Sequence, residues 1–79
     1  MMKRNIIAIV TTNSGVLGRI GNLLSRAQLD VDGLTMQKLP GKGMSDISML
    51  IDTDDAHKVD HFIKQMDRFV DVISVADMT

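Results

Sequence analysis

The chain has 79 residues, and we expect residues 1–79 to form one small domain. A domain of this size buries only about 60% of the surface that its unfolded chain exposes, so its stability in isolation is marginal. The sequence contains no cysteine, which excludes stabilisation by disulfides. We therefore expect association with another chain to supply part of the stability.

Charge and hydropathy exclude two classes of binding partner. The 9 basic and 10 acidic residues give a net charge of −1, without the surplus of Lys and Arg that nucleic-acid binding requires. The apolar run at residues 6–10 is too short for a signal peptide, and no stretch approaches the roughly 20 apolar residues of a membrane span. We predict a soluble cytoplasmic protein that binds neither nucleic acid nor a membrane.

The first half of the chain predicts a strand, a helix and a second strand. Residues 6–10 are continuously apolar and rich in β-branched side chains, which is typical of a strand covered on both faces. Residues 12–15 supply turn and capping residues. An apolar stripe with helical spacing follows, made of Val16, Leu17, Ile20, Leu23, Leu24 and Ala27. Residues 29–39 return to extended character, with a bulge expected at Gly33.

The second half repeats this order after a turn at residues 40–43. Ile47, Met49 and Ile51 alternate with other residues in the strand period of two. Acidic residues at 52–55 favour a helix start, and the helical stripe that follows contains Val59, Phe62, Ile63 and Met66. The final strand is predicted from Val70, Val72, Ile73 and Val75, with Val72 on the face opposite to Ile73 and Val75.

The order β-α-β-β-α-β predicts an α+β, ferredoxin-like fold: a four-stranded antiparallel sheet with two helices on one face. Two helices cannot bury both faces of one sheet. We therefore expect the second face, or an unpaired edge strand, to meet another protein chain.

No enzyme or metal site can be assembled from the sequence. The serines have no His partner near them in the predicted topology, and there is no cysteine nucleophile. His57 and His61 share a helix face but lack further His or Cys ligands, so solvent exposure is the simpler interpretation. We predict no catalytic residue, no metal and no cofactor.

The junction between the first strand and the first helix is the strongest candidate binding site. A helix N-terminus presents backbone N–H groups and partial positive charge, which suit a carboxylate, and Gly15 permits close approach. A plain helix N-cap explains the same residues, and the pattern alone favours that simpler alternative.

Several segments of the chain resemble the small subunits of acetolactate synthase (acetohydroxyacid synthase), which contain an amino-acid-binding ACT domain. The similar segments are residues 12–20, 23–26 and 29–35, together with a closing segment at 63–75 that is the more family-specific part. The resemblance implies a non-catalytic regulatory subunit whose partner is the thiamine-diphosphate-dependent enzyme that begins branched-chain amino-acid synthesis.

Such subunits pair side by side through an edge strand and bind valine at the interface. The resemblance assigns effector contacts to one loop and, across the interface, to the start of the second strand; these residues are Thr12, Asn13, Gly15, Val16 and Leu17 in one subunit and Asp30 and Val31 in the other.

Two positions depart from the family pattern, since Thr12 and Asp30 stand where its members usually carry Asn. Asp30 could pair with the ammonium group of an effector. The chain also resembles the short members of the family, which lack a second domain. Two alternatives stay open: a free-standing amino-acid sensor with a different partner, and a purely structural dimerisation module.

Overall fold

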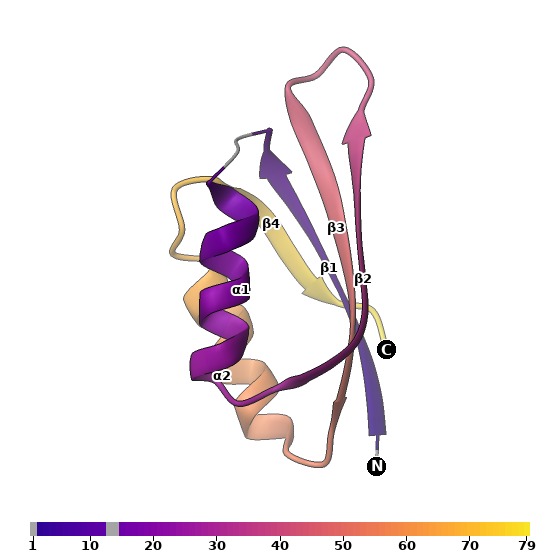
Figure 1. The fold of residues 1–79 in the computed structure, drawn as a ribbon, viewed down its shortest axis with the longest axis vertical. Helices are drawn as coiled ribbons and strands as arrows, with labels where there is room; N and C mark the ends of the chain where they lie inside the picture. Colours follow the sequence, from indigo (N-terminus) through magenta and orange to yellow (C-terminus); the bar gives the residue numbers. More distant parts are fainter. Residues whose placement is uncertain (1, 13–14) are drawn as a thin grey trace.

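The structure is a computed structural model that describes residues 2–12 and 15–79. Its elements are β1 (Met2–Thr11), α1 (Val16–Arg26), β2 (Asp30–Leu39), β3 (Met44–Thr53), α2 (Ala56–Met66) and β4 (Val72–Asp77). This order confirms the predicted β-α-β-β-α-β arrangement. Figure 1 shows both helices on the same side of the sheet, as the ferredoxin-like class requires.

The four strands form one sheet in the order β2-β3-β1-β4, and every neighbouring pair is antiparallel. The two central strands, β1 and β3, each contribute three buried apolar side chains, more than either edge strand, β2 or β4. Cross-strand partners share a face of the sheet, so the register shows which side chains meet the helices. Ile6 lies opposite Met49, and Ala8 lies opposite Ile47.

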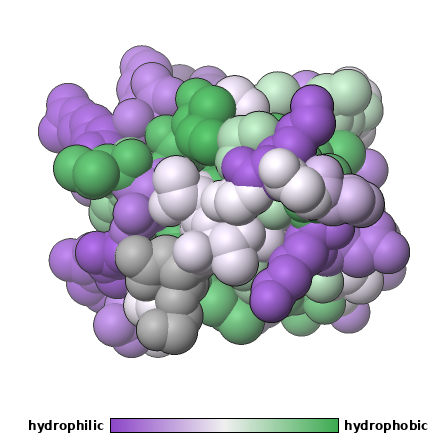
Figure 2. Space-filling model, turned by 90° about the horizontal axis from the view of Figure 1, so that it is seen from above, coloured by the Kyte–Doolittle hydropathy of each residue, from purple (hydrophilic) through white to green (hydrophobic). Residues whose placement is uncertain are grey.

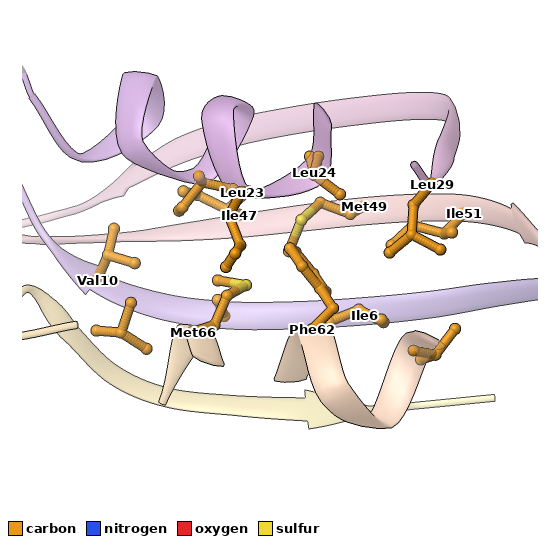
Figure 3. Packing of buried hydrophobic residues seen from close by; sticks show 14 of the residues in the cluster. Ile6, Val10, Leu23, Leu24, Leu29, Ile47, Met49, Ile51, Phe62 and Met66 are labelled. Carbon is orange, nitrogen blue, oxygen red and sulfur yellow. The ribbon is translucent and has the colours of Figure 1, made fainter. Parts of the chain in front are cut away.

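The hydrophobic core lies between the helices and one face of the sheet. In Figure 3 the side chains of Phe62 and Met66 from α2 point toward those of Leu23 and Leu24 from α1, above the central strands. The buried apolar set contains residues from every element except β2: Ile6, Ala8, Val10, Val16, Ile20, Leu23, Leu24, Leu29, Ile47, Met49, Ile51, Val59, Phe62, Met66 and Val72. Both predicted helical stripes therefore face the core, with the exception of Leu17, which is exposed.

The opposite face of the sheet has no helix over it. Ile7 and Ile9 on β1 point to this side and are only half-buried, so the expectation that β1 is covered on both faces is wrong within this chain. Polar side chains of the neighbouring strands share the face, among them Ser48 and Thr35, which lie opposite each other. The predicted partner for this face stays a prediction.

Two details of the last strand differ from the sequence analysis. Val70 precedes β4 and is 97% exposed, so it does not belong to the strand. Val75 faces the helices together with Val72, because a register shift leaves Ile73 as the extra residue of a β-bulge. Strict alternation cannot detect a bulge, which explains the wrong face assigned to Val75.

The turns form as predicted, and a bulge in β2 shifts the register between Val31 and Gly33. The turn between β2 and β3 contains two glycines in the left-handed region, Gly41 at φ 69° and Gly43 at φ 62°, where other residues are strained. The carboxylate of Asp55 caps α2 and accepts the backbone N–H of His57 at 3.0 Å.

An ion pair joins the start of β1 to the end of β4. The guanidinium of Arg4 donates to one carboxylate oxygen of Asp77, from Nε at 2.9 Å and from Nη2 at 2.5 Å. Burial opposes ionisation of Asp77, but hydrogen bonds from the backbone and hydroxyl of Thr79 and from Arg4 outweigh it. Together they lower the pKa of Asp77 below its ordinary value of 3.8.

We expect Asp77→Asn to reduce the free energy of unfolding at pH 7 by roughly 1–2 kcal/mol, since a partly buried charged hydrogen bond is lost. Because the pKa of Asp77 is lower in the folded state, its stabilisation is complete above pH 3.8 and disappears as the pH falls through the folded value. Urea unfolding of both proteins across pH 7 to 2 checks this. The difference should vanish at low pH, and a difference independent of pH would contradict it. The exposed Asp60→Asn variant is the matched control.

Candidate functional site

The end of β1 is held tightly where it leads toward α1. The backbone N–H of Thr11 donates to the carbonyl of Asp71 at 2.8 Å, and that of Thr12 donates to the carbonyl of Gly43 at 2.9 Å. The hydroxyl of Thr12 is 3.0 Å from that of Ser45, a buried polar residue of β3. Thr12 therefore bonds to the sheet of its own chain.

Asp71 connects both sides of the β1–α1 junction. Its carboxylate accepts the hydroxyl of Thr11 at 3.1 Å and also pairs with the guanidinium of Arg19 in the second turn of α1. Thr11 precedes the junction and Arg19 follows it, so one carboxylate holds the two ends of this segment. The sequence analysis missed this network because Asp71 lies 60 residues from Thr11, and no local pattern links them.

The helix start itself offers backbone groups more than side chains. Gly15 is the N-cap residue of α1. It is exposed, its dihedral angles are helical (φ −86°, ψ −15°), and as a glycine it has no side chain that could cap the helix. The N–H groups of the first turn have no acceptor inside the helix, and they carry the positive end of the helix dipole. This arrangement can hold a carboxylate.

The other residues predicted at this junction differ in what they can contribute. The side chain of Val16 is fully buried in the core, so only its backbone can meet a ligand. Leu17 is 40% exposed and presents an apolar side chain beside the helix start. Asn13 lies outside the described residues. In Figure 2, which looks down on this end of the molecule, hydrophilic residues form most of the rim, and hydrophobic ones show at separate places between them.

The second half of the predicted site lies at the opposite end of the sheet. Asp30 pairs with Asp52, whereas Thr11 pairs with Met44. These β3 residues are eight positions apart, which corresponds to about 26 Å at roughly 3.3 Å per residue. Asp30 and Val31 are both exposed, but within one chain they do not meet the β1–α1 junction.

The remaining candidate residues lie on the surface. His57 and His61 are exposed on α2, and His61 has the side-chain amide of Gln65 as a partner at 3.0 Å. Within residues 2–12 and 15–79, no group of three or more His, Cys, Asp or Glu residues is arranged to hold a metal ion. None of the helices in the same described part is long and apolar enough to cross a membrane.

Comparison with known proteins connects this arrangement to one family. The sequence model of a family described as "AHAS small subunit-like ACT domain" matches residues 6–74. The acetolactate synthase small subunit of Bacillus subtilis (strain 168) is 31% identical over 78 residues, which are 99% of this chain and 45% of that protein. The small subunit of Aquifex aeolicus (strain VF5) is 29% identical over 79 residues, 99% of this chain and 41% of that protein.

Among solved structures, the acetolactate synthase small subunit from Thermotoga maritima superimposes with a TM-score of 0.85 at 19% identity, covering 98% of this chain and 47% of that one. The chain thus spans less than half the length of each of these three relatives. The match of the family model over most of the sequence, with the observed fold, shows that the chain belongs to the family of AHAS small subunit-like ACT domains.

Proposed function

We propose that the chain is a non-catalytic regulatory subunit of acetolactate synthase that binds valine, or a related branched-chain amino acid, between two copies of itself. In this proposal the dimer modulates a thiamine-diphosphate-dependent catalytic subunit in the cytoplasm. Family membership and the names of the relatives in Bacillus subtilis and Aquifex aeolicus support the regulatory role.

The observation that carries the proposal is the separation of the two halves of the site. The β1–α1 junction and Asp30 lie about 26 Å apart along the sheet, so one chain cannot enclose a single amino acid between them. Antiparallel pairing of β2 with β2 of a second copy reverses the strand direction. Asp30 of each copy then lies at the end of the sheet where α1 of the other copy begins.

The β2 edge suits such pairing better than the β4 edge. β2 has ten residues and β4 has six. Each strand contains a bulge, but that of β2 lies near its start, so residues 33–39 pair with β3 without interruption. Val31 and Leu34 lie opposite buried β3 residues, yet they are 38% and 37% exposed because the sheet ends beside them. A second copy alongside β2 would cover these apolar side chains.

Charge along β2 favours the antiparallel arrangement of two copies. The strand begins with the acidic residues Asp30 and Asp32 and carries Lys38 near its end. Antiparallel pairing brings Lys38 of one copy toward the acidic start of the other, whereas parallel pairing would place like charges together. Opposite charges on neighbouring strands stabilise a sheet, and like charges destabilise it.

The groups available at this interface match the chemistry of a free branched-chain amino acid. The N–H groups at the start of α1 suit the effector carboxylate, and the exposed carboxylate of Asp30 suits its ammonium group. Leu17 of one copy and Val31 of the other supply apolar surface for the branched side chain.

We expect valine at about 100 times its dissociation constant to raise the free energy of unfolding by roughly 2.7 kcal/mol, a shift of melting temperature on the order of 10 °C. Asp30→Ala should weaken valine binding about tenfold or more, because the ammonium group loses its charged partner. Thermal unfolding against each of the 20 amino acids measures both effects, with the exposed Asp60→Ala as the control variant.

A flat response to all twenty amino acids would contradict the proposed effector site. The alternatives are separated by adding an acetolactate synthase catalytic subunit and following its activity. Valine binding without any effect on that activity would indicate a sensor with another partner. Association of two copies together with no response to any of the twenty amino acids would indicate a structural dimerisation module.

The proposed interface also predicts a specific cross-link. Because the chain has no cysteine, a single cysteine scanned through residues 33–37 should form an intermolecular disulfide fastest at the position on the twofold axis of a β2–β2 pair. Non-reducing electrophoresis after mild oxidation measures the rate. Ser74→Cys on the opposite edge strand is the control, and equal cross-linking at Ser74→Cys would exclude a specific β2 interface.

A further inference from the structure

A second candidate site lies away from both halves of the proposed effector site. It is an open hollow of about 550 Å³ between one side of α1 and the connection from α2 to β4. Its lining consists of polar residues from α1 and one aromatic ring: Arg19, Asn22, Ser25, Arg26 and Phe69. The volume lies in the range typical of sites for small molecules.

Helical spacing explains why the polar side chains converge. Arg19, Asn22 and Arg26 follow one another at intervals of three and four residues, so they lie on one side of α1. This side is adjacent to the core-facing stripe and turned toward Phe69. Phe69 is half-buried and packs against the core, which gives the hollow an apolar wall.

The lining is made of hydrogen-bond donors and contains no carboxylate. Two guanidinium groups, an amide and a hydroxyl all carry N–H or O–H groups. Arg19 is already oriented by its ion pair with Asp71, so this donor is held in place. Arg26 is exposed in the last turn of α1, and within residues 2–12 and 15–79 no carboxylate pairs with it.

A position near the C-terminus of a helix favours a cation such as Arg26 on its own. That effect does not account for Asn22, Ser25 and a second arginine gathered around the same hollow beside an aromatic ring. Planar guanidinium groups bind carboxylates and phosphates through paired hydrogen bonds, and they are the groups that proteins use for such anions.

We propose that this hollow is a binding site for a small organic anion. A phosphate or carboxylate group would bind Arg26, with Asn22 and Ser25 as further donors and Arg19 at the margin, while the remainder of the ligand lies against Phe69. The proposal goes beyond the proposed function and does not depend on it, because its main contacts come from Asn22, Ser25 and Arg26 of α1 and from Phe69. Only Arg19, at the margin, also belongs to the network at the β1–α1 junction.

The test uses the full chain and two probes, inorganic phosphate and succinate, each titrated at constant ionic strength balanced with chloride. We expect saturable changes of backbone amide resonances at residues 22–26 and at Phe69. Arg26→Gln should weaken this binding about tenfold or more, since a charged hydrogen bond to the anion is lost. Saturation by one probe or by both supports the site and identifies the anionic group that it prefers.

Lys42→Gln is the matched control, because it removes the same charge from the exposed turn between β2 and β3. Ser25→Asp is a second variant, in which a carboxylate placed inside the hollow should abolish anion binding. Arg26, Ser25 and Lys42 are all exposed, so the variants should remain folded. Loss of the cation in the last turn of α1, or a carboxylate at residue 25, should lower the unfolding temperature by only a few degrees. Absence of saturation with both probes, or equal weakening by Lys42→Gln and Arg26→Gln, would overturn the proposal.

Discussion

One-sided burial of the sheet is the constraint on which the rest of this structure depends. Two helices of eleven residues cover one face of four strands, and the core forms only there. The edge strand β2 contributes no fully buried side chain, although its register points Val31, Leu34 and Met36 toward the helix side. The helices thus cover the central strands on one face, while apolar side chains at the β2 edge stay partly exposed.

This open edge and the direction of the strands together explain how a small chain could sense a ligand. The start of α1 and the start of β2 lie at opposite ends of the sheet because an eleven-residue helix connects them. In a twofold symmetric pair of such chains, the start of α1 of each copy lies near the start of β2 of the other copy. Two equivalent sites would then arise from one interface, and ligand binding would be linked to dimer stability.

The network around Asp71 gives the proposed effector loop a fixed frame. Its carboxylate holds Thr11 and Arg19, while Thr12 is bonded to Gly43 and to Ser45. The segment between these anchors is therefore short and attached at both ends. Thr12 uses its hydroxyl within the chain. In the proposed site, the polar contacts that the described residues offer an effector are therefore the backbone groups at the start of α1 and Asp30 of a second copy.

Most of the fold could be predicted from the sequence because it rests on local periodicity. The stripes through Val16 to Leu24 and through Val59 to Met66 face the core as their spacing indicates, and Asp55 caps α2. Spacing alone can also mislead. The small residues Gly18, Gly21 and Ser25 follow helical spacing that is typical of close helix packing, but all three are exposed, and nothing lies within 4 Å of a Cβ added at either glycine.

What the sequence could not provide depends on contacts between distant residues. The bulge at Ile73 places Val75 on the helix side of the sheet. An alternating pattern of apolar residues cannot reveal such a bulge. The β1–α1 junction could be proposed from the helix start alone, but its combination with Asp30 came only from the resemblance, since no local signal connects Thr12 with Asp30. The bond between Thr12 and Ser45 appears only when the strands are assembled, because the two residues are 33 positions apart in the sequence.

The most direct test of the central claim is complementation between two inactive variants. Gly15→Glu places a negative charge where the effector carboxylate would bind, and Asp30→Lys places a positive charge where its ammonium group would bind. If each site combines one loop with Asp30 of the other copy, refolding an equal mixture should restore about one quarter of the wild-type valine-binding sites, because half of the dimers then contain one intact site. Calorimetric titration measures that capacity, and a mixture that binds no more valine than either variant alone would contradict the account.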